Sequence, residues 1–150
     1  VRQGVFAAAQ NGTVAGYEVV DVKVTLVDGS FHPVDSSEMS FKAAASIGLK
    51  EALRKAKPIL LEPVMEIEVV TPAEALGTVL GDLNSRRSSI QNIEGSDDIQ
   101  RIRALIPLVN SFGYATNLRS MTQGRATHTM EFKQYESVPQ GLLTEIVKQG

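Results

Sequence analysis

The strongest constraint on the fold is the order of hydrophobic patterns in the second half of the sequence. Segments rich in apolar and β-branched residues, as is typical of strands, occur at residues 64–70, 89–94, 100–106 and 126–135. Two further segments between them carry apolar residues at helical spacing. The order strand–helix–strand–strand–helix–strand predicts a four-stranded antiparallel sheet with two helices on one face.

This order is the ferredoxin-like βαββαβ arrangement, and its helices have recognisable ends. Thr71 is expected to cap the first helix, with Pro72 in its first turn, and this helix is predicted to end near residues 86–87. The second helix follows Pro107 and ends at Gly124. The side chains that it is predicted to point into the core are Phe112, Ala115, Leu118 and Met121.

The first half of the sequence predicts a separate small domain. Residues 1–10 are expected to be the end of a helix, and residues 17–28 alternate apolar and polar side chains as a half-buried strand does. Asp35 and Glu38 resemble a capping box that starts a long helix. A domain boundary is predicted near Pro63, where one pattern ends and another begins. The expected fold is therefore α+β, with two small α/β-sandwich domains.

Basic residues lie along one face of the long helix in the first half. Lys42, Lys50 and Arg54 share this face and are separated by multiples of four residues. A solvated helix surface is one interpretation of such a stripe, and a surface that faces nucleic-acid phosphates is the other.

Composition and motifs exclude several classes of function. The sequence has no cysteine, which excludes disulfides, thiol catalysis and thiolate metal sites. It has no glycine-rich phosphate-binding loop and no apolar run near the roughly 20 residues that cross a bilayer. The net charge of −2 argues against a strongly basic nucleic-acid binder but leaves local basic surfaces open. We expect a cytoplasmic protein without a membrane partner.

The loop before the long helix carries the side chains that could bind a ligand. Phe31 and His32 are planar groups that could stack on bases, and the histidine could donate a hydrogen bond to RNA oxygens. An alternative is that Phe31 folds back onto the core. A metal-dependent enzyme that uses Asp28, His32 and Asp35 is a further alternative, although a third strong ligand is not evident and no metal is predicted.

Several long strings in the sequence resemble elongation factor G, the bacterial ribosomal translocase. The first is GSFHPVDSSE at residues 29–38. The others are LEPVM, GDLNSRR, FGYATNLRS and TQGRA, at residues 61–65, 81–87, 112–120 and 122–126. Together they extend over nearly the whole chain.

The resemblance implies the domain organisation. Residues 1–63 would be the later part of domain IV, a partial ribosomal-protein-S5-like fold, residues 64–140 would be the ferredoxin-like domain V, and residues 141–150 a C-terminal tail. The GTPase domain, domains II and III and the first half of domain IV would be missing. GTP and Mg²⁺ would therefore bind elsewhere in the parent protein, and this part would have no cofactor and no catalytic residue.

The resemblance also implies partners and sites. The fragment would be a monomer that contacts the ribosome, with domain IV at the tRNA–mRNA pair in the decoding centre and domain V at large-subunit rRNA. The tip loop would comprise Gly29, Ser30, Phe31, His32, Pro33, Val34 and Asp35. Candidate contacts to rRNA phosphates are Lys42, Lys50, Arg54, Arg86, Arg87, Arg119 and Arg125. A paralogous translational GTPase such as a ribosomal-protection protein, and a ferredoxin-like ligand-binding regulatory module, are the alternatives.

Overall fold

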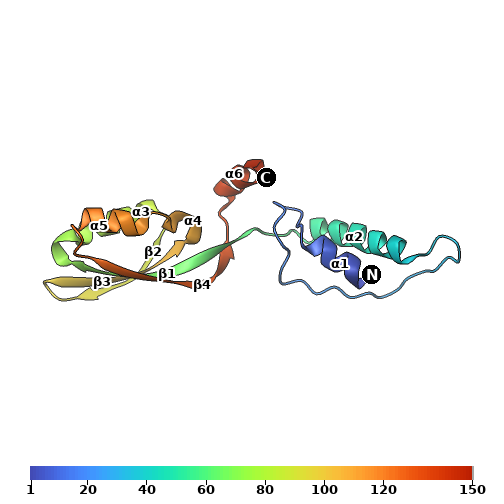
Figure 1. The fold of residues 1–150 in the computed structure, drawn as a ribbon, viewed down its shortest axis with the longest axis horizontal. Helices are drawn as coiled ribbons and strands as arrows, with labels where there is room; N and C mark the ends of the chain where they lie inside the picture. Colours follow the sequence, from blue (N-terminus) through green and yellow to red (C-terminus); the bar gives the residue numbers. More distant parts are fainter. Residues whose placement is uncertain (150) are drawn as a thin grey trace. The chain divides into compact units, whose positions relative to one another are not determined.

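The computed structural model describes residues 1–149, which form two compact units. The sheet unit is Leu61–Ser137, and the helical unit is Val1–Leu60 together with the described residues from Val138 onward. Figure 1 shows the helices and strands of each unit.

The sheet unit has the predicted strand–helix–strand–strand–helix–strand order. Its strands pair antiparallel throughout in the order β2-β3-β1-β4. In Figure 1 the helices α3 and α5 lie on one face of this sheet, so the predicted α+β, ferredoxin-like fold is confirmed. The elements are β1 (Leu61–Pro72), η1 (Ala73–Ala75), α3 (Leu76–Ser85), β2 (Ser89–Gly95), β3 (Ile99–Pro107), α4 (Leu108–Ser111), α5 (Tyr114–Met121) and β4 (Thr127–Ser137).

The core of the sheet unit lies between the sheet and its helices. Strands β1 and β3 alternate, so every second side chain points to the helices and becomes buried. The fully buried members are Ile67, Val69, Ile102, Ala104 and Ile106 from the strands and Val79, Leu83, Tyr114 and Leu118 from the helices. Each large apolar side chain in this set contributes about 1.5–3 kcal/mol through its removal from water. The sheet unit therefore has a core of its own.

The predicted helix after Pro107 is interrupted. Gly113 has φ 73°, a left-handed conformation that separates α4 from α5. The interruption changes the phase of the helix, so Tyr114 is buried while Phe112 is 72% exposed. Ala115 is also exposed. The prediction that Phe112 and Ala115 point inward was therefore wrong, whereas Leu118 is buried as expected.

The expected cap at Thr71 is also absent, because β1 continues through this residue. Thr71 and Pro72 still pair with β3, and the Thr71 hydroxyl donates to the Pro72 carbonyl at 3.4 Å. The chain turns into η1 only after Pro72, and α3 begins at Leu76.

The edges of the sheet unit differ from the expected domain limits. Pro63 lies inside β1, opposite Tyr135 of β4 and beyond the last residue pair that β1 makes with β3. A strand tolerates proline at such a position because one side of it is unpaired. Residues 140–149, most of which were expected to form a tail, are helix α6 (Gln140–Gln149).

The helical unit is built around a contact between α1 (Arg2–Ala9) and α2 (Glu38–Lys55). Ala8, Leu49 and Leu53 are its buried apolar residues. Gly4 lies so close to the Lys42 carbonyl of α2 that a Cβ atom would clash with it. Among residues 1–149 no helix is long and apolar enough to cross a membrane.

The predicted strand at residues 17–28 does not form. These residues lie outside any helix or strand, and no strand of the described chain pairs with them. The alternating residues Val20, Val22, Val24 and Leu26 are each more than half exposed. A strand requires a neighbour for its backbone N–H and C=O groups, so the alternating pattern alone is not sufficient.

Tyr114 supplies a test of the sheet-unit core. Its hydroxyl is buried without a hydrogen-bond partner among the described residues. Burial raises the pKa of this phenol well above its usual range, with a smaller contribution from the charge of Asp82. Because Tyr114→Phe removes a buried polar atom without breaking a bond, we expect it to leave the free energy of unfolding unchanged or slightly higher. Urea unfolding measures this.

The control is Leu118→Ala. Its free energy of unfolding should be about 2–5 kcal/mol lower than that of the wild type, because the substitution leaves a cavity in the core. The wild-type chain should also lose stability as pH rises above about 10. In that range the Tyr114 phenol ionises in the unfolded state but stays protonated in the folded state. Tyr114→Phe should lack that part of the alkaline loss. If Tyr114→Phe lowered the free energy of unfolding by more than about 1 kcal/mol at neutral pH, the Tyr114 hydroxyl would not be a buried group without a hydrogen-bond partner.

Candidate nucleic-acid interface

The predicted tip loop, residues 29–35, lies between the extended segment and α2. Figure 1 shows this part of the chain as a turn beyond the N-terminal end of α2. All of its residues are exposed, with Phe31 at 71% and Val34 at 84%. Phe31 therefore does not fold back onto the core.

The loop is attached to α2 by a capping box. Ser37 Oγ accepts a hydrogen bond from Ser40 N at 3.1 Å, and Ser40 Oγ accepts one from Ser37 N at 2.7 Å. The Ser40 hydroxyl also lies 3.1 Å from the Asp35 carbonyl. The expected cap formed by Asp35 and Glu38 was wrong: Ser37 is the N-cap, two residues later, because its hydroxyl reaches the third residue of the helix.

His32 holds the loop together from within. Its Nδ1 accepts hydrogen bonds from Val34 N at 3.3 Å and Asp35 N at 3.4 Å. His32 N donates to Ser36 Oγ at 2.7 Å, and Ser36 N donates to the His32 carbonyl at 3.0 Å. The imidazole is 63% exposed despite these bonds. The loop therefore has a fixed shape that presents a planar polar ring to solvent.

The acidic residues near His32 do not assemble a metal site. Asp28 accepts a hydrogen bond from the neighbouring Gly29 N at 2.7 Å, and Asp35 Oδ2 lies 3.4 Å from His32 Nδ1. Within residues 1–149 no group of three or more potential metal ligands is present. The arrangement therefore gives the metal-dependent alternative no support.

The predicted basic residues of α2 are exposed and only weakly paired. Lys42 Nζ lies 3.4 Å from Glu38, and Arg54 lies 3.6 Å from Glu51, each within one turn of the helix. Lys50 is exposed on the same helix. Exposed ion pairs of this kind contribute about 0–1 kcal/mol, so these cations can exchange their partners for phosphates at little cost.

Arg86 and Arg87 are engaged within the sheet unit. Arg86 pairs with Asp82 at 2.8 Å and donates to the Asn110 and Phe112 carbonyls at 3.0 Å. Its guanidinium lies 5.3 Å from the centre of the Tyr114 ring. Arg87 pairs with Glu62 at 2.6 Å and donates to the Asn110 side chain. Both guanidinium groups connect segments distant in sequence, a role that sequence reasoning missed.

Two of the predicted arginines of the sheet unit remain at its surface. Arg119 is exposed on α5. Arg125 is about half exposed, pairs with Glu74 and donates to the Thr122 carbonyl at 3.2 Å. His128 of β4 is partly buried and packs edge-on against Tyr114 with ring centres 5.4 Å apart.

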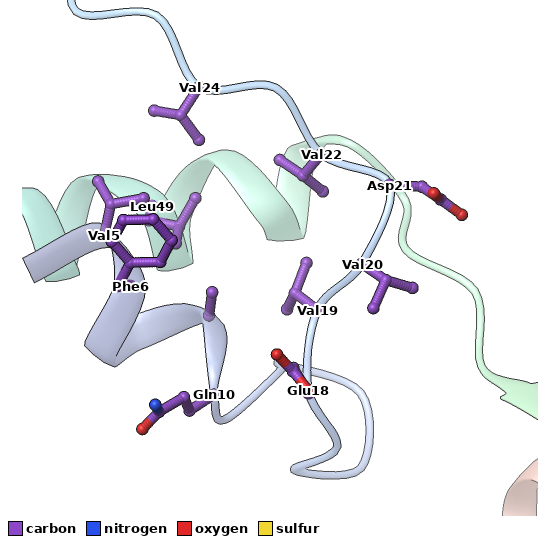
Figure 2. Close-up of a pocket in the computed structure, with 11 residues that line it drawn as sticks. Val5, Phe6, Gln10, Glu18, Val19, Val20, Asp21, Val22, Val24 and Leu49 are labelled. Atoms are coloured by element: carbon purple, nitrogen blue, oxygen red, sulfur yellow. The ribbon is translucent and has the colours of Figure 1, made fainter. Parts of the chain in front are cut away.

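A shallow apolar groove lies elsewhere in the helical unit. Figure 2 shows Val5 and Phe6 of α1 opposite Val19, Val22 and other residues of the extended segment. Its lining is predominantly apolar and contains no group of polar side chains that converge on one point. The groove therefore lacks the chemistry of a catalytic site.

Family comparisons agree with these two units. The features described above define an α+β module of two units, one of which has a ferredoxin-like four-stranded sheet. Residues 1–57 match the family described as elongation factor G, domain IV, and residues 59–146 match elongation factor G C-terminus. The chain belongs to the elongation factor G family.

A solved structure is similar to this chain in fold and sequence. A crystal structure of a protein from Thermus thermophilus matches 99% of this chain with 36% sequence identity and a TM-score of 0.85. The match covers 22% of that protein, so this chain spans about a fifth of its length.

Arg86 offers a test of the sheet unit. Arg86→Met removes the bonds to Asp82 and to two carbonyls, leaving these polar groups without their partner in a partly buried position. We expect the free energy of unfolding to fall by about 1–3 kcal/mol in urea. The matched control, Arg119→Met at an exposed position, should stay within about 0.5 kcal/mol of wild type. Equal effects of the two substitutions would show that Arg86 is not a structural residue.

Proposed function

We propose that this chain is the ribosome-contacting C-terminal part of an elongation factor G that promotes GTP-dependent translocation of tRNA and mRNA. The observation that carries the proposal is the His32 loop, which is exposed and yet hydrogen-bonded to a capped helix. A loop with a fixed shape suits a mechanical element, because a flexible tip could not bias the movement of a tRNA.

The proposed mechanism makes use of this geometry. The loop enters the decoding centre and blocks return of the tRNA–mRNA pair, and α2 transmits force to the loop through the Ser37–Ser40 capping box. Phe31, exposed beside His32, is available to stack on a base. Energy comes from GTP hydrolysis in the GTPase domain of the longer protein, where GTP and Mg²⁺ bind. This part of the protein has no catalytic role of its own.

Contacts to rRNA phosphates come from basic residues at the surface of each unit. Exposure and weak pairing favour Lys42, Lys50, Arg54, Arg119 and Arg125 for this role. Arg86 and Arg87 instead support the interface by holding the sheet unit together. The partners are both ribosomal subunits in the cytoplasm, and the chain acts as a monomer.

Ribosome binding tests the proposal on this chain directly. The chain should sediment with ribosomes at low salt, and its affinity should fall as salt rises, because bound cations are released from RNA phosphates. Lys50→Glu and Arg119→Glu should each weaken binding and reduce the salt dependence. Lys23→Glu, at an exposed position outside the proposed contacts, is the charge-matched control.

Two outcomes of this assay would contradict the proposal. Absence of sedimentation at low salt would favour a ligand-binding regulatory module instead. An equal loss of binding in Lys23→Glu and Lys50→Glu would show that only the total charge matters.

His32→Ala tests the mechanical role in the full-length factor. Removal of the imidazole deletes both the loop bonds and the exposed ring, so translocation measured by stopped flow should slow by about tenfold or more, which corresponds to about 1.4 kcal/mol in the barrier. GTP turnover should stay near the wild-type rate because its site lies in another domain. Unchanged translocation would rule out the His32 loop as the working tip.

A further inference from the structure

The extended segment at residues 17–28 has the side-chain pattern of a strand but no neighbouring strand in the described chain. Its alternating apolar side chains, among them Val22, Val24 and Leu26, are more than half exposed. No hydrogen bond of the described chain involves a backbone group of residues 20–27. An exposed apolar segment with unpaired N–H and C=O groups is a template for pairing with another strand.

The charges of the segment select one register for pairing with a second copy of itself. In an antiparallel pair centred on Val22, the Asp21 of each copy lies opposite the Lys23 of the other. A shift of two residues places either two copies of Asp21 or two copies of Lys23 opposite each other. A shift of one residue places both charges opposite valines. The segment is therefore complementary to itself in a single register.

The same register also pairs the apolar residues. Val20 lies opposite Val24 of the other copy, and Val22 lies opposite its own equivalent. Directly opposite side chains project from the same face of a sheet, so these valines form one continuous apolar face. Cross-strand pairs of opposite charge and of apolar residues each contribute about 0.2–1 kcal/mol, and this register contains both kinds.

Asp21 is the residue at which the segment departs from an extended conformation. It has φ 57°, in the left-handed region, and Figure 2 shows it where the chain bends between Val20 and Val22. This conformation costs a residue other than glycine about 1–2 kcal/mol. A strand requires a negative φ, so pairing straightens the segment at Asp21 and removes this cost.

We propose that two copies of the free chain associate through residues 18–26, which pair as antiparallel strands about a two-fold axis at Val22. The two copies use the same surface, so the assembly closes at a dimer. Two short strands form a small interface, which corresponds to a Kd in the micromolar to millimolar range. The dimer is a form of the free chain, and the function proposed above, in which a single chain acts on the ribosome, does not depend on it.

Sedimentation equilibrium of the 150-residue chain measures the association. We expect the average mass to rise from 16.2 kDa toward that of a dimer as the concentration approaches about 1 mM. A monomer over the whole range would overturn the proposal and would assign the segment to a strand of a different protein or of a longer chain. Species larger than a dimer would also overturn it, because the proposed pairing closes at two copies.

Charge reversal tests the register. Lys23→Glu and Asp21→Lys each place like charges opposite each other twice, so each dimer should be about fivefold or more weaker than that of the wild type. An equimolar mixture of the two variants should regain association, because each variant is complementary to the other. Failure of the mixture to associate would overturn the register.

Lys50→Glu is the matched control for these variants. It makes the same change of charge at an exposed position of α2, outside the paired segment, and should leave the dimer at wild-type strength. If Lys50→Glu weakened the dimer as much as Lys23→Glu, only the total charge would matter and the proposal would be overturned.

Cross-linking tests the position of the two-fold axis. The sequence has no cysteine, so Val22→Cys supplies one thiol per chain. Directly opposite residues have Cα atoms about 4.5–5.5 Å apart, within the range of a disulfide. Val27→Cys is the control, because residue 27 is 91% exposed but would lie at opposite ends of the paired strands. We expect Val22→Cys chains to link at least about tenfold faster, and equal rates would overturn the proposal.

Discussion

The hydrogen bonds from the Val34 and Asp35 amides to His32 Nδ1 are the interaction on which the functional account depends. They close the loop upon itself, and the Ser37–Ser40 capping box attaches that closed loop to an 18-residue helix. Each bond contributes only about 1 kcal/mol, but together they fix the loop backbone and the ring orientation without burying the ring. Rigidity and exposure, which usually oppose each other, therefore occur together at His32.

The two units differ in the size of the apolar core that each one buries. The sheet unit has a closed core between four strands and two helices, and Arg86 joins α3 to the segment around Gly113 through its bonds to main-chain carbonyls. The helical unit has a small core at Ala8, Leu49 and Leu53, and its extended segment leaves apolar side chains exposed. The sheet unit therefore has the larger core, and the helical unit carries the exposed His32 loop.

The parts of the fold that could be predicted are those set by local periodicity. The order of strands and helices in the sheet unit follows from the spacing of apolar residues, and the exposed His32 loop follows from turn residues before a helix start. The parts that could not be predicted depend on distant partners or on one backbone angle. Residues 17–28 alternate but have no neighbouring strand among residues 1–149. The left-handed Gly113 interrupts the helix next to the exposed Phe112, and Arg86 binds carbonyls 24 and 26 residues away.

Directed cleavage of RNA from the loop tests the central claim most directly. The sequence has no cysteine, so Val34→Cys, at a position 84% exposed, accepts an iron chelate at a single place. With this tether the account predicts cuts in small-subunit rRNA and mRNA at the decoding centre, which the same tether at Asp97→Cys in the β2–β3 turn should not produce. Absence of these cuts with Val34→Cys on ribosomes that bind the chain, or the same cuts from both positions, would contradict it.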